Sequence, residues 1–83
     1  MALQNAVLPA GAFAITPSDA NRVNFTALYV GVGGDVAVLP EDQNSVTGVA
    51  VTFRNAPSGS VLPIQGKKVL ATGTTAAGIL GLR

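Results

Sequence analysis

The second half of the chain consists of short β-prone runs that glycine and proline separate at close intervals. Three stretches carry this pattern, at residues 27–40, 51–64 and 69–80. Val, Leu, Tyr and Phe favour strands, whereas Gly and Pro mark turns and strand ends. No stretch keeps an apolar stripe at helical spacing for more than one turn. We therefore predict an all-β fold.

The first predicted hairpin joins residues 27–32 to residues 35–39. Both runs are rich in β-branched residues, and Gly33-Gly34 between them can take the positive φ angles of a type I′ turn. We therefore expect the two runs to lie side by side in one sheet. Replacing both glycines by valine is then expected to prevent folding, because a branched residue adopts positive φ only at a cost.

The remaining runs extend the same pattern. Residues 46–55 and 60–64 flank Ala56-Pro-Ser-Gly59, which predicts a type I turn and a second hairpin. Pro63 marks an edge or a strand end, because proline has no N–H for a ladder. Runs at 67–72 and 79–83 bring the total to about six to seven short strands, typical of a small antiparallel β-sandwich or barrel.

Residues 1–26 are predicted to form an extended N-terminal arm with a first strand at 12–16, and residues 27–83 a single β domain. The arm lacks a basic segment and an unbroken apolar run, which argues against a signal peptide or a membrane helix. Its large apolar side chains need a place to be buried: Leu3, Val7, Leu8, Phe13 and Ile15. Either they cover their own domain, or the arm reaches a neighbouring subunit or a larger assembly.

Composition excludes several classes of function. The chain has neither cysteine nor histidine, so it offers no disulfide, no thiolate metal site and no base to activate its serines and threonines. Glu41 and Asp42 are adjacent in a polar stretch, and the side chains of adjacent loop residues rarely converge on one ligand. With a net charge of +1 and four aromatic residues, the chain also lacks the basic, stacking surface of a nucleic-acid binder. We expect no enzyme, cofactor, metal, nucleic acid or membrane partner.

The small size of the chain favours self-association. A domain of 83 residues has a limited core, and a chain without disulfides or metals gains stability by burying surface against copies of itself or a partner. Lys67-Lys68 is the one local concentration of charge, and on a strand the two side chains point to opposite faces. Either they protect a solvated edge, or one of them joins Arg54 against an acidic groove of a partner.

Five segments of the chain carry a family likeness. They are Ala27-Leu-Tyr-Val-Gly, Gly34-Asp-Val-Ala-Val, Val51-Thr-Phe, Ala56-Pro-Ser-Gly-Ser-Val-Leu-Pro-Ile and Lys68-Val-Leu-Ala-Thr-Gly-Thr-Thr-Ala. Over residues 16–82 the chain resembles the spike base proteins of gene transfer agents and related tailed phages, which often carry basic residues where this chain has Gln65-Gly66. The resemblance implies a small structural protein of the virion head surface, on which a fibre is mounted.

From the resemblance we expect a non-enzymatic capsid decoration (cement) or head spike-base subunit, made in the host bacterial cytoplasm. Its partners would be copies of itself about a symmetry axis, the major capsid protein and a spike or fibre protein. The candidate interface comprises the five apolar arm residues together with Arg54, Lys67 and Lys68. The alternative is a β module of a tail fibre or baseplate that binds a receptor or glycan, with Tyr29 as its one polar aromatic residue.

Overall fold

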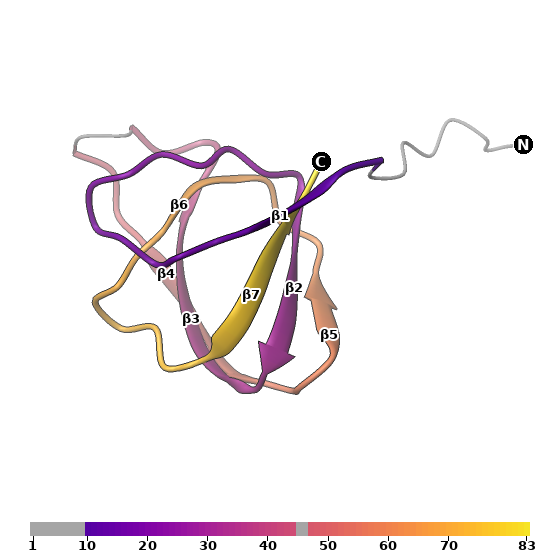
Figure 1. The fold of residues 1–83 in the computed structure, drawn as a ribbon. Helices are drawn as coiled ribbons and strands as arrows, with labels where there is room; N and C mark the ends of the chain where they lie inside the picture. Colours follow the sequence, from indigo (N-terminus) through magenta and orange to yellow (C-terminus); the bar gives the residue numbers. More distant parts are fainter. Residues whose placement is uncertain (1–9, 45–46) are drawn as a thin grey trace, which may run out of the picture.

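Seven strands in two antiparallel sheets make up the fold (Figure 1). The computed structural model describes residues 10–44 and 47–83. The strands are β1 (Ala12–Ala14), β2 (Ala27–Val32), β3 (Gly34–Pro40), β4 (Val51–Ala56), β5 (Ser60–Leu62), β6 (Gly66–Val69) and β7 (Ala77–Leu82). The first sheet has the order β1-β7-β2-β5 and the second the order β4-β3-β6. The predicted all-β class is confirmed, and no helix in the described residues is long and apolar enough to cross a membrane.

The core lies between the two sheets and follows the alternation of the strands. Leu28 and Val30 of β2 are fully buried, and Val36 and Val38 of β3 face them from the second sheet. Tyr29, between the two buried residues of β2, points the other way and stays half-buried. Across residues 28–30 of β2 the side chains alternate between the core and the outer face, and each fully buried one contributes about 1.5–3 kcal/mol. In β3 burial does not alternate, because Ala37 and Leu39 are buried as well.

The first predicted hairpin is wrong. β2 pairs with β5 and β7, whereas β3 pairs with β4 and β6, so the chain passes from one sheet to the other at Gly33. Gly33 does not have a positive φ. Instead, a Cβ atom there would lie 2.7 Å from the carbonyl oxygen of Ala56 and 3.0 Å from the amide nitrogen of Ser58. The glycine permits two backbones to approach closely and does not form a type I′ turn.

The second predicted hairpin is also wrong. β4 belongs to the second sheet and β5 to the edge of the first, so the connection again crosses between the sheets. The turn lies one residue later than predicted: the amide of Ser60 donates to the carbonyl of Pro57 at 3.2 Å, and Gly59 has a φ of 79°. The preceding strand starts at Val51 and not at residue 46, which lies outside the described residues. Pro63 directly follows the edge strand β5, as predicted.

The last two strands are displaced from their predicted bounds, because the chain leaves the ladder after Val69. The amide of Leu70 donates to the carbonyl of Ala37 at 2.9 Å, and the hydroxyl of Thr74 accepts from the amide of Ala37 at 2.9 Å. A threonine hydroxyl thus takes the place of a backbone group beside β3. This loop replaces the second half of the strand predicted at residues 67–72.

Residues 10–26 lie along the edges of both sheets. β1 pairs with β7 in the first sheet, as seen where the two strands cross in Figure 1. Further along, the amide of Val23 donates to the carbonyl of Lys67 at 2.8 Å, and the amide of Phe25 to the carbonyl of Gly66 at 3.0 Å. The described part of the N-terminal region therefore covers the outer edge of β6.

Candidate interaction surfaces

The described residues provide surfaces for binding and no reaction centre. Across residues 10–44 and 47–83, no three His, Cys, Asp or Glu side chains gather where they could hold a metal ion. None of the buried side chains in the described part is polar or charged. Glu41 and Asp42 lie exposed in the loop after β3. The features described below are therefore surfaces that could contact another molecule.

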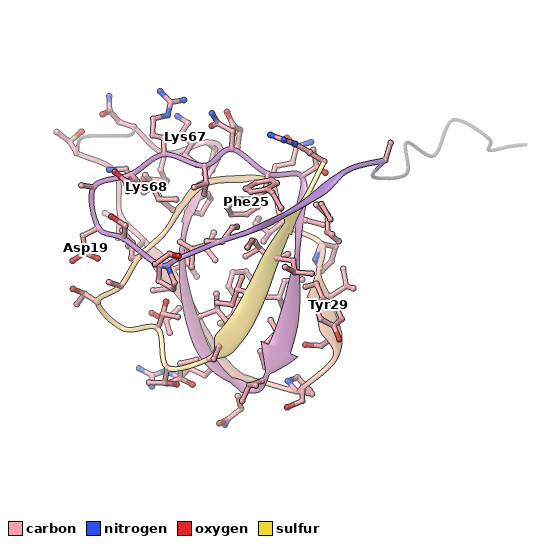
Figure 2. All side chains as sticks on the ribbon, in the orientation of Figure 1. Asp19, Phe25, Tyr29, Lys67 and Lys68 are labelled. Atoms are coloured by element: carbon pink, nitrogen blue, oxygen red, sulfur yellow. The ribbon has the colours of Figure 1, made fainter. Side chains whose placement is uncertain are left out.

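The outer face of the first sheet carries no charge. The register places Tyr29 beside both Val61 of β5 and Leu80 of β7, on the face opposite the core. All nine charged residues of the chain lie outside the four strands of this sheet. Figure 2 shows Tyr29 on the side of the β2 and β5 pair that points away from the second sheet. We call this surface the charge-free face: Ala12, Ala14, Ala27, Tyr29, Val61, Leu80 and Leu82.

The arm residues that the structure describes pack on their own domain. Ile15 is buried in the core cluster, and Phe13 packs against it. The Phe13 ring occupies the space that a side chain at Gly81 would need, and the guanidinium of Arg83 lies 4.6 Å from the centre of the ring. For these two residues the structure shows the first of the two alternatives. Leu3, Val7 and Leu8 lie outside the described residues.

The predicted cationic residues are held apart. β4 and β6 flank β3 on opposite edges, so Arg54 does not share a patch with Lys67 and Lys68. Arg54 is exposed and lies 3.8 Å from the carboxylate of Asp35, an ion pair worth about 0–1 kcal/mol. The ammonium of Lys67 donates to the carbonyl of Gln43 at 2.6 Å.

Lys68 lies beside the N-terminal segment, near Asp19 (Figure 2). Its ammonium donates to the carbonyl of Asp19 at 3.4 Å. The two lysines thus bond to different segments, consistent with the opposite faces expected for neighbours on a strand. The interface role of all three cations stays a prediction.

Asp19 fastens the N-terminal segment to the loop before β7. One carboxylate oxygen accepts from the hydroxyl of Thr72 at 2.6 Å, and the other accepts from the amide of Thr72 at 3.0 Å. The hydroxyl bond is the main cause that lowers the pKa of Asp19 below its ordinary value of 3.8, and the amide bond adds to it. No local pattern in the sequence indicates this contact, because the two residues are 53 positions apart.

This contact predicts an acid-sensitive contribution to stability. Because the pKa of Asp19 is lower in the folded than in the unfolded chain, its carboxylate stabilises the fold above about pH 3.8 and loses this effect as the pH falls through the folded value. Asp19→Asn should therefore unfold more easily near neutral pH and show a flatter loss of stability in acid. Urea unfolding at several pH values measures both, with Asp42→Asn in an exposed loop as the control. Parallel pH curves for Asp19→Asn and the wild type would contradict the assignment.

The second sheet has one open edge, with an apolar hollow at its end. β4 pairs with β3 alone among the described residues. Val49 and Val51 at its start are 71% and 50% exposed. Beside them lies a hollow of about 440 Å³, lined by Pro40, Glu41, Asp42, Gln43, Val51, Ile64 and Gln65. This surface cannot be predicted from the sequence alone, since which strand ends at an open edge depends on the pairing of all the others.

The described residues thus form a small all-β domain with a charge-free face and an open strand edge. No protein-family model and no curated protein matches the chain. A solved structure, described as the capsid of a native gene transfer agent particle computed with C5 symmetry, contains a chain that is 34% identical, with a TM-score of 0.76. The match covers 95% of this chain and 93% of that one. This protein therefore belongs to the family of that capsid component, a family of virion structural proteins.

Proposed function

We propose that this protein is a non-enzymatic head-surface subunit of a gene transfer agent or tailed phage, acting as a capsid decoration or spike-base protein. The observation that carries the proposal is the match, over nearly the full length of both chains, to a component of a gene transfer agent capsid. Copies of the protein, made in the host bacterial cytoplasm, would assemble about a symmetry axis and bind the major capsid protein. A spike or fibre protein would be mounted on them.

The mechanism that we propose is stabilisation by surface burial. A protein that binds the assembled shell and not the separated subunits shifts the equilibrium towards the shell. The charge-free face supports this role, because its apolar side chains are free of the desolvation cost that charges would bring to an interface. Leu3, Val7 and Leu8 would add a second contact from the N-terminal arm.

Binding to purified heads tests the proposal. We expect the protein to co-sediment with heads and to raise the temperature at which they release DNA. Val61→Asp places a charge beside Tyr29, at the β5 edge of the charge-free face, and should reduce the bound fraction about tenfold or more, the result of losing roughly 1.4 kcal/mol. Glu41→Gln, in the exposed loop after β3, is the matched control. If the protein did not co-sediment with the heads, the proposal would be wrong.

The arm is tested separately by removing residues 1–9. We expect the truncated protein to keep its fold, because residues 10–44 and 47–83 contain both sheets and the core cluster. If the arm grips a neighbour, the head-bound fraction falls while the isolated domain is unchanged. A truncated protein that binds heads as well as the full chain would remove Leu3, Val7 and Leu8 from the interface.

A further inference from the structure

The open edge of β4 differs from every other sheet edge in the described chain. β1 and β5 are edges of only three residues each, and Pro63 follows β5. The outer edge of β6 is covered by the segment that contains Val23 and Phe25. β4 has six residues and no proline; its one charged residue, Arg54, and the register shift of the ladder both lie towards its end and leave residues 51–53 unprotected. It is therefore the edge best suited to pair with another strand.

The hydrogen bonds of β3 determine to which side the backbone amide and carbonyl of each β4 residue point. Ala37 directs both its amide and its carbonyl to the β6 side, where Thr74 and Leu70 bond to them. In an antiparallel ladder the backbone groups of alternate residues bond to opposite neighbouring strands. The backbone amides and carbonyls of Val36 and Val38 therefore point to β4. The backbone amides and carbonyls of their partners on β4, Phe53 and Val51, must then point to β3.

Thr52 lies between those two partners, opposite Ala37. By the same alternation its amide and carbonyl point away from β3 towards the open edge. Arg54 and residue 50 share this direction, since each is two positions from Thr52. Beyond Arg54 the ladder is interrupted: the register shifts, Asn55 has a φ of 55°, and its amide donates to the carboxylate of Asp35 at 3.0 Å. The regular open edge is thus centred on Thr52.

We propose that two copies of the chain pair through β4, antiparallel and centred on Thr52. This register sets Thr52 opposite Thr52 of the second copy, a favourable cross-strand pair, with backbone bonds in both directions. Val51 then lies opposite Phe53 of the second copy on the same face, which covers the half-exposed valine twice across the two-fold axis. The two β4 edges would join the second sheets of both copies into one continuous sheet.

Charge selects this register over its neighbours. Centring the pair on Thr52 places the two Arg54 residues four positions apart, about 13 Å. A register centred on Arg54 would set like charges directly opposite each other, which is destabilising. A register centred on Phe53 would place Val51 against Asn55 of the second copy, where the ladder is irregular. A second copy of the chain is therefore the occupant that fits the backbone, the apolar side chains and the charge.

Thr52→Pro is the direct test, in the isolated protein. Proline removes the outward amide without touching the bonds to β3, and edges tolerate proline where the amide faces outward. We expect the wild type to sediment as a dimer and Thr52→Pro to raise the dissociation constant about tenfold or more. Thr52→Val, which keeps the amide and the branched side chain, is the matched control and should stay dimeric. A dimer that is equally strong with proline would overturn the proposal.

A second measurement keeps the proposal testable if the proline variant fails to fold. The chain contains no cysteine, so Thr52→Cys introduces its single thiol. Mild oxidation should link two copies of this variant, whereas Val61→Cys, on the edge strand β5 and also exposed, should remain unlinked. Absence of linkage at Thr52 in a folded protein would overturn the pairing.

The pairing rests on the self-association in the proposed function, and its failure can be told apart from failure of that function. An isolated protein that is monomeric at all concentrations overturns the β4 pairing, whatever the heads bind. If that monomer nevertheless binds heads, and Thr52→Pro abolishes the binding, the occupant of the edge is a strand of the capsid protein and not a second copy. Failure to bind heads, in contrast, leaves the dimer measurement unaffected.

Discussion

Phe25→Ala is expected to lower the free energy of unfolding by about 3–5 kcal/mol, the usual cost of removing a buried aromatic ring. Phe25 is 3% exposed, and its ring fills the space above Gly66, where a Cβ atom would lie 2.5 Å from the ring. A chain of 83 residues has a total stability of about 4–12 kcal/mol. The variant should therefore lose a large share of this stability, which equilibrium urea unfolding followed by circular dichroism would show as a lower unfolding midpoint.

Phe53 provides the control for this result. It packs against the core from the edge strand β4 and is only partly buried, so Phe53→Ala should cost distinctly less than Phe25→Ala. Gly66→Ala should destabilise the fold by forcing the Phe25 ring out of its place, and combining it with Phe25→Leu should relieve part of that loss. A Phe25→Ala variant within about 1 kcal/mol of the wild type would contradict the packing described for this ring.

Gly33→Val is expected to destabilise the fold by about 1–3 kcal/mol or more, because the new side chain meets backbone atoms that cannot move aside. The carbonyl of Ala56 and the amide of Ser58 both lie within 3.0 Å of the Cβ position. The amide of Gly33 also donates to the hydroxyl of Ser58 at 2.8 Å, and any shift would break that bond. Thermal and urea unfolding measure the loss.

Asparagine at the same position separates crowding from backbone strain. Asparagine tolerates a left-handed backbone, so Gly33→Asn would be mild if this residue formed a type I′ turn. Under crowding, Gly33→Asn loses at least as much stability as Gly33→Ala. Gly11→Ala is the control, since the Cβ atom there meets its nearest neighbour at an ordinary 3.4 Å. If Gly33→Asn lost little stability while Gly33→Ala lost much, the crowding interpretation would be wrong and a type I′ turn at Gly33 would be supported.

The function could be inferred from the sequence only at a coarse level. The absence of cysteine and histidine argued against most chemistry, and the family resemblance pointed to a virion, which the match to a gene transfer agent capsid component supports. The charge-free face was readable in principle, because none of the strands of the first sheet contains a charged residue. Its use as a surface required knowing that these four strands share one sheet.

The placement of the basic residues shows why the site was harder to predict than the fold. Arg54 and Lys68 are close in the sequence and both lie on strands, yet β3 separates their strands. The contact between Asp19 and Thr72 is long-range and involves two polar residues of ordinary type. Such polar contacts depend on the positions of loops, which no local periodicity records.

The sequence by itself determined that the chain is all-β and which side chains of a strand share a face. These properties are local, since alternate residues of a strand face opposite sides and since Gly and Pro interrupt strands wherever they occur. Only the tertiary structure decided which strands pair. Backbone hydrogen bonds are the same for every sequence and therefore do not specify which strands pair. Ala27–Val32 and Gly34–Pro40 are neighbours in the chain and yet lie in different sheets. That choice follows from burying both apolar faces in one core, and it leaves β4 as the open edge.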